Sequence, residues 1–129
     1  MLEEAIYNEI KNDDTIATKL ANGTGKYHIY PLRVPDNIQF TKAVVYTEIT
    51  QNLIYPLART SVVQISCLAE SFEDAISLSA DIDRIFNDKA EYSMGGKLSV
   101  NYTKFSGRNS YYDAESKMFI IAVEISIKF

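Results

Sequence analysis

Thr60–Asn87, TSVVQISCLAESFEDAISLSADIDRIFN, decides the fold, because a strand pattern changes into a helix pattern within it. Val63, Ile65 and Cys67 occupy alternate positions, which predicts a half-buried strand. From Ser71 onward the apolar residues recur at three- and four-residue steps, which predicts an amphipathic helix over about 71–87 with Asp81 on its solvent side. Ser71 with Asp74 three residues on is a variant of the capping box and predicts the cap of this helix. The predicted core of the domain comprises Val63, Ile65, Cys67, Phe72, Ile76, Ile82 and Phe86.

Length and composition indicate one folded domain, 1–129, that can bury a core without disulfides. Hydrophobic residues make up 47% and charged residues 23%, as in ordinary globular proteins. One cysteine and one histidine exclude an internal disulfide and a Cys/His metal cluster. The sequence lacks a long apolar run and begins with an acidic amphipathic segment, so we expect neither secretion nor membrane insertion.

Charge is unevenly distributed along the chain. Residues 1–14 sum to −4 and residues 70–91 to −5, whereas 15–69 and 92–129 sum to +3 and +2. The predicted helices are therefore acidic and the remaining segments slightly basic. Such polarity suits electrostatic matching between protein subunits, and it is equally typical of solvated helix faces. No dense basic stripe of a nucleic-acid reader is present.

The rest of the chain predicts an α+β fold. Two short N-terminal helices come first. An extended segment interrupted by prolines follows them, and it is either an edge strand or an ordered arm. A strand at 43–50 then pairs with the strand at 62–67. After the long helix come a strand at 97–105, a polar loop at 106–114 and a last strand at 117–129. We expect a mainly antiparallel sheet of four or five strands with the long helix packed on one face.

Two apolar features predict contacts beyond the core. The connection 51–59 is too apolar for a solvated hairpin turn, so it packs on its own domain or on a partner. The last strand is apolar on both faces in its first half, which requires a cover, either the N-terminal helices or a second copy of the chain. The predicted interaction residues are Leu53, Ile54, Tyr55, Leu57, Arg59, Met118 and Ile120.

No constellation of residues indicates catalysis, cofactor binding or metal binding. Cys67 lies on the apolar face of its strand, where a thiol behaves as a small hydrophobe, and His28 has no predicted catalytic partner. Asp81 and Asp83 fall on different helix faces, and the loop carboxylates Asp113 and Glu115 are typical of solvated groups. We therefore expect a protein that is not an enzyme and needs no cofactor.

Four stretches together resemble a known family. Ile29–Pro35, IYPLRVP, resembles an arm with a Tyr-Pro pair and a later proline, and Ala43–Tyr46 resembles the first full strand after it. Arg59 with the strand and helix that follow resembles the most recognisable block, and Tyr112–Phe119 resembles the turn into the last strand. In this order the stretches resemble the tail-completion, or head-to-tail joining, proteins of long-tailed bacteriophages, which are related to tail terminators.

This resemblance implies a structural virion protein made in the host cytoplasm and located in the phage tail. It implies a ring, typically a hexamer, at the head-proximal end of the tail. The implied partners are other copies of the chain, the tail tube protein and the head completion or connector protein. DNA passes through the lumen without sequence-specific binding, and no membrane is involved. The alternative is a non-enzymatic ligand-binding or regulatory α+β domain of the host, with 53–57 lining a pocket.

Overall fold

Six strands form one mixed sheet in the computed structural model, which describes the backbone of residues 2–21, 25–54 and 58–129 and their side chains except in 50–54 and 58–59. The strand order is β1-β2-β3-β6-β5-β4, and every pair is antiparallel except β1 with β2. The strands are β1 (Ile29–Pro31), β2 (Lys42–Ile54), β3 (Ala58–Ala69), β4 (Lys89–Met94), β5 (Leu98–Asp113) and β6 (Met118–Lys128). The α+β class and the mainly antiparallel sheet are confirmed.

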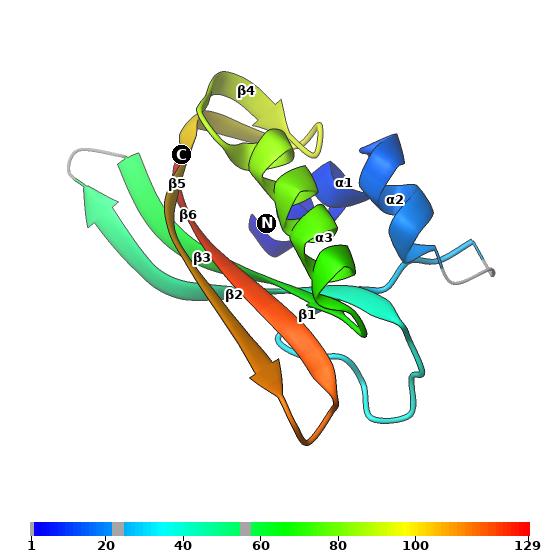
Figure 1. Ribbon diagram of the computed structural model, residues 1–129. Helices are drawn as coiled ribbons and strands as arrows, with labels where there is room; N and C mark the ends of the chain where they lie inside the picture. The colour runs from blue at the N-terminus through cyan, green and yellow to red at the C-terminus, as the bar shows by residue number, and fades with distance from the viewer. Residues whose placement is uncertain (1, 22–24, 55–57) are drawn as a thin grey trace.

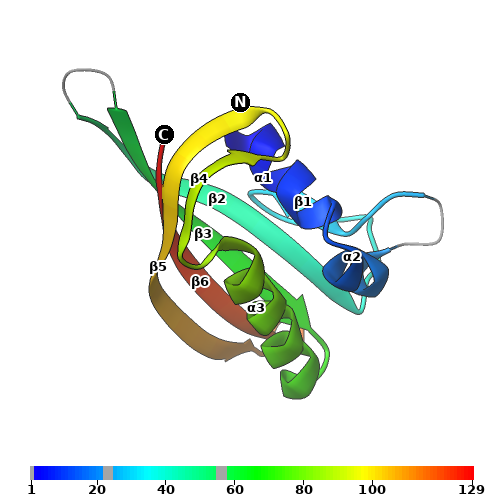
Figure 2. The same ribbon diagram turned by 90° about the horizontal axis from the view of Figure 1, so that it is seen from above.

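The helices within the described ranges cover one face of this sheet (Figure 1). They are α1 (Leu2–Lys11), α2 (Asp14–Leu20) and α3 (Phe72–Phe86). The sheet curls around the helix layer when seen from above (Figure 2). The expectation of one long helix packed on the sheet is therefore incomplete, because α1 and α2 share that face with α3. None of the helices in the described ranges is long and apolar enough to cross a membrane.

The predicted sheet of four or five strands is too small. The edge strand β4 follows α3 directly, and its sequence KAEYSM alternates polar and apolar residues, with Met94 buried. Six residues between a helix and a glycine turn are a short strand signal, which explains why the sequence prediction omitted β4. At the other edge, the short strand β1 pairs with β2 from Ile29 opposite Val44 to Pro31 opposite Tyr46. Pro31 lacks an amide donor, and its place at the end of an edge strand accommodates that loss.

The β2–β3 hairpin corrects the expectation of a loop at 51–59. Both strands extend into this segment, β2 as far as Ile54 and β3 from Ala58, with Leu53 opposite Arg59 and Ile54 opposite Ala58. The ends of the two strands project beyond the rest of the sheet (Figures 1 and 2). Apolar and β-branched residues are equally suited to a strand, so the composition that argued against a solvated turn also fits a longer hairpin.

β5 likewise runs through the segment expected to be a polar loop at 106–114. It pairs with β6 as far as Asp113 opposite Met118, after a bulge between Phe105 and Gly107. Most side chains beyond the bulge are exposed, so the alternation that marks a half-buried strand is lost although the backbone stays paired.

The core lies between the sheet and the helix layer. Its members on the predicted strand and helix include Val63, Ile65, Cys67, Ile82 and Phe86, all of which are buried. Phe72 and Ile76 are corrections, because their side chains are 45% and 43% exposed. The face of α3 that packs on the sheet is centred on Ala75, Leu78 and Ile82, so Phe72 and Ile76 lie on its flank.

Polar contacts join the N-terminal helices to α3. Asp13 caps α2 by accepting a hydrogen bond from the backbone N–H of Ile16 at 3.1 Å, and its carboxylate also binds the Arg84 guanidinium. Lys19 donates from Nζ to Oδ2 of Asp81 at 2.7 Å, and Asp81 is buried. The helix pattern had placed Asp81 on the solvent side, and α2 provides its cover.

Candidate functional site

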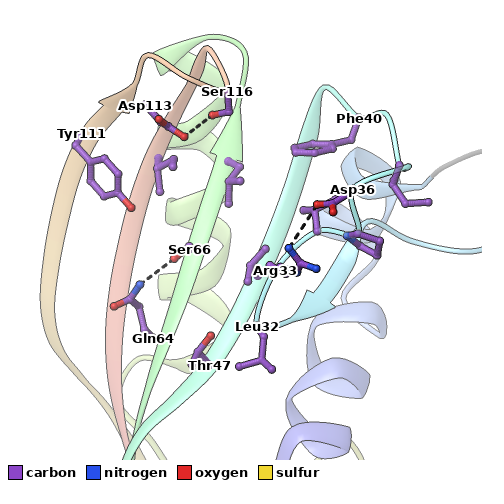
Figure 3. Close-up of a pocket in the computed structure, with 16 residues that line it drawn as sticks. Leu32, Arg33, Asp36, Phe40, Thr47, Gln64, Ser66, Tyr111, Asp113 and Ser116 are labelled. Atoms are coloured by element: carbon purple, nitrogen blue, oxygen red, sulfur yellow. Dashed lines mark hydrogen bonds and ion pairs between the residues drawn. The ribbon is translucent and has the colours of Figure 1, made fainter.

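An open groove lies on the face of the sheet opposite the helices (Figure 3). One wall is the arm that follows β1. At its start Leu32 adopts a left-handed conformation with φ 68° and donates its N–H to the carbonyl of Tyr46 at 3.0 Å. A turn follows in which the N–H of Ile38 donates to the carbonyl of Pro35 at 3.1 Å. Two prolines and this turn thus hold the arm over the sheet.

The floor of the groove is formed by side chains that alternate with the core residues along four strands. It mixes apolar and polar groups, namely Val45, Thr47, Gln64, Ser66, Leu68, Tyr111 and Ile120. The arm contributes Leu32, Arg33, Val34, Pro35, Asp36, Ile38 and Phe40, and the volume of the open groove is about 550 Å³. Because β-strand side chains alternate between faces, the residues that fill the core also determine which residues line the groove.

Short polar contacts hold both rims of the groove. At one rim Arg33 pairs with Asp36 at 3.4 Å, and both side chains are largely exposed. At the other rim Asp113 accepts hydrogen bonds from the Ser116 hydroxyl at 2.7 Å and the Glu115 N–H at 3.2 Å. On the floor Gln64 donates to Ser66 at 3.1 Å, as Figure 3 shows. The charges of Arg33 and Asp36 balance at the first rim, whereas Asp113 keeps its negative charge at the second because both of its donors are neutral.

Met118 and Ile120 lie on this face, and the arm lies over them. Ile120 is 9% exposed and lines the groove, whereas Met118 is 5% exposed and lines a neighbouring hollow beside Ile38 and Phe40. The cover that the last strand requires is therefore supplied in large part by the chain's own arm, which was not one of the expected covers. Whether these two residues also contact another chain stays a prediction.

The other predicted interaction residues are separated from the groove. Leu53, Ile54 and Arg59 lie on the projecting β2–β3 hairpin, and Tyr55 and Leu57 lie outside the described residues. The structure does not bring the hairpin together with the groove, because Ile54 and Ala58 pair at one end of the sheet and Leu68 and Ile120 pair near the other.

A second surface, the end patch, comprises Phe72, Tyr111, Tyr112 and Phe119. The Phe119 ring lies 4.8 Å from the Tyr112 ring and 5.8 Å from the Phe72 ring, measured between centroids. Tyr111 and Tyr112 are 49% and 51% exposed. The sequence interpretation missed this patch because it placed Phe72 in the core and the two tyrosines in a loop. The sequence feature that could have revealed the patch is the pair of adjacent aromatic residues, Tyr111 and Tyr112, close before the apolar last strand.

Cys67 and His28, the residues considered for nucleophilic chemistry, lie in different surroundings, one in the core and the other beside two aromatic rings. Burial raises the pKa of the Cys67 thiol well above its usual range, which keeps it protonated. Nδ1 of His28 lies 2.8 Å from the Tyr30 hydroxyl, and its ring packs near Phe40 under the arm. Among the residues that the structure describes, no group of three or more His, Cys, Asp or Glu side chains is placed to hold a metal ion.

Comparison with known proteins gives a match in structure alone. No protein-family model and no curated protein sequence matches the chain. A chain from the virion of a native gene transfer agent particle has a similar structure, with a TM-score of 0.73 at 15% sequence identity. The match covers 98% of this chain and 92% of that chain, so the two share a fold over nearly their full lengths.

Proposed function

We propose that the chain is a structural virion protein, a tail-completion subunit that joins the tail to the head of a phage particle. The observation that carries this proposal is the fold shared, over nearly the whole of both chains, with a component of a gene transfer agent virion. The four stretches of sequence that resemble the family also support it. They fall on the elements that the resemblance implies, namely β1 with its arm, β2, β3 with α3, and the β5–β6 turn.

In this role the chain is not an enzyme and acts by packing against other proteins. We propose that copies form a ring, sixfold by analogy with the family, at the head-proximal end of the tail tube. Its partners would be the tube protein and the head connector, with DNA passing through the lumen. The exposed end patch, the groove and the projecting hairpin provide three surfaces for such contacts.

The test is to mix the purified protein with tails that lack a completed head-proximal end and to image the products by electron microscopy. A ring of density at one end of the tube is the expected result. Tubes that stay unmodified at high protein concentration, in the presence and absence of purified connector, would contradict the proposal.

A second candidate is the non-enzymatic ligand-binding domain. The groove favours it, since a space of about 550 Å³ lies within the range of small-molecule sites. Its described lining comes from the arm and the sheet floor. A small molecule that raises the melting temperature of the protein, with the effect abolished by Ile120→Lys on the groove floor, would favour this candidate over the virion role.

A further inference from the structure

Three hollows on the sheet face opposite the helices join into one continuous surface along β6, which we call the β6 track. The groove under the arm has Ile120 on its floor, and the hollow at one end of it has Met118. The hollow at the other end has Ala122 and Glu124, and it shares part of its lining with the groove, including Gln64. Alternate residues of a strand lie on one face, so the three hollows follow one another along β6.

The length of the track fits an extended peptide. It runs along β6 from Met118 to Glu124, with the arm on one side of the groove and β5 on the other. Six steps of about 3.3 Å make it about 20 Å long, the length of about seven extended residues. Every second side chain of such a peptide would point to the floor, in step with the alternate β6 residues below it.

A carboxylate lies at each end of the track. Asp113 lies opposite Met118 and lines the groove (Figure 3), and Glu124 lies opposite Gly107 at the far end. Both side chains are partly buried, and none of the ion pairs among the described residues includes either of them. The described donors to Asp113 are neutral, and Gly107 has no side chain that could cover Glu124.

The other charges that line the track are balanced. The two charges of the arm neutralise each other in an ion pair. Arg108 lines the third hollow, but its guanidinium binds Asp83 of α3 at 2.7 Å. Glu70 and Lys117 have opposite charges and line the same hollow, and Lys104 lines a separate hollow beside β4. The carboxylates at the two ends therefore give the track its negative charge.

The middle of the track is apolar but keeps hydrogen-bonding groups. Its apolar floor and wall come from Val45, Leu68, Ile120, Ile38 and Phe40. Polar side chains beside them can bind the backbone of an extended peptide, and they are Thr47, Gln64, Ser66 and Asn109. A ligand that matches the whole track thus has apolar side chains between two cations.

We propose that the β6 track binds an extended segment of a partner protein that has basic residues six positions apart and apolar residues at the two alternate positions between them. The basic side chains pair with Asp113 and Glu124, and the apolar side chains lie over Ile120 and Ala122. The inference deepens the proposed function by giving the chemistry of one partner. It rests on that function only for the partner's being a virion protein.

The sequence of the chain itself argues against a second copy as the occupant. No two of its 13 Lys and Arg residues are six positions apart. A segment of another protein therefore matches the charges and spacing of the track better than any segment of this one.

The first experiment measures binding of a capped, fluorescent peptide, Lys-Ser-Ile-Ser-Ile-Ser-Lys, by fluorescence anisotropy. Two matched peptides replace both lysines by glutamate or both isoleucines by serine. Each replacement is expected to weaken binding at least about tenfold, through lost charge pairing or lost apolar contact. Raising the salt concentration should weaken binding of the lysine peptide, because partly exposed charge pairs are screened.

The second experiment changes the protein. Asp113→Asn with Glu124→Gln removes both charges at nearly constant shape, and an about tenfold loss of affinity for the lysine peptide is expected. The matched control is Glu73→Gln with Asp88→Asn, which changes the net charge equally at two exposed positions that do not line the track. Circular dichroism checks that both variants are folded.

Three results would overturn the proposal. One is that the three peptides bind alike, and another is that the control variant loses as much affinity as the track variant. The third is self-association of the unmodified chain that the track variant abolishes, because a second copy would then occupy the track.

Peptide binding and tail capping are scored separately. A chain that caps tail tubes but does not prefer the lysine peptide keeps the virion role and overturns the inference about the track. A chain that binds the lysine peptide through Asp113 and Glu124 but never caps a tube supports the inference and contradicts the virion role.

Discussion

Gly95 shows at the scale of one residue how the β4–β5 turn packs on α1. It has φ +62°, and a Cβ built there would lie 2.6 Å from the carbonyl oxygen of Ala5. Gly96 has φ +74° with no atom within 4 Å of a built Cβ, so it provides a matched control. We expect Gly96→Ala to cost about 1 kcal/mol through backbone strain and Gly95→Ala about 2–4 kcal/mol through strain and displacement of α1. Urea unfolding of both variants measures the difference, and equal losses would contradict the packing explanation.

Asp13 gives a prediction about pH. Hydrogen bonds from Arg84 are the largest cause that lowers the pKa of this carboxyl below its ordinary value, and the cap to Ile16 adds to it. A carboxyl with a lowered folded-state pKa stabilises the fold above its unfolded pKa of about 4, and this contribution is lost as the pH falls through the folded value. Asp13→Asn keeps the cap and removes the charge.

We therefore expect Asp13→Asn to lower the free energy of unfolding by about 1 kcal/mol at pH 7, since Arg84 is half exposed and solvent weakens the pair. The difference from the unmodified chain should shrink toward zero as the pH falls through the folded pKa of Asp13. Denaturant unfolding at a series of pH values measures it. A difference that is constant with pH would mean that the charge has no part in it.

At the scale of one element, α3 offers two isoleucines in different surroundings. Ile82 is fully buried between the helix and the sheet, whereas Ile76 is on the exposed flank. Ile82→Ala is expected to cost about 2–5 kcal/mol because it leaves a cavity in the core, and Ile76→Ala less than about 1 kcal/mol. Thermal and denaturant unfolding of the two variants provides the measurement. A comparable loss at both sites would mean that the flank of α3 is covered in solution.

Local pattern predicted the elements in which burial and periodicity agree. The strand at Val63–Cys67 and the cap at Ser71 were read correctly, since one alternates cleanly and the other has a specific side-chain acceptor. The second half of β5 was missed because backbone pairing with β6 holds it in a strand although most of its side chains are exposed. β4 was missed although its sequence alternates, because six residues between a helix and a turn are a short signal.

The surfaces were less predictable than the elements, because they depend on tertiary contact. Met118 and Ile120 were correctly seen to need a cover, but the sequence does not show that the arm with Ile38 and Phe40 supplies it. Asp81 matched a solvated position on α3 until Lys19 of α2 was placed beside it. The exposure of a side chain is decided by which element lies across from it.

At the scale of the whole molecule, hydrogen exchange can locate the contact between copies. β3 and β6 are paired on both sides and lie under the helices, so their amides, as in Val63–Cys67 and Ile121–Ile125, should exchange most slowly. On assembly into the proposed ring, protection should rise by about tenfold or more in at least one of the three proposed contact surfaces, the end patch, the groove and the projecting hairpin. Protection along the arm would identify the groove as the surface between copies, because only a partner seated there would shield those amides, whereas exchange that is unchanged throughout would contradict the ring.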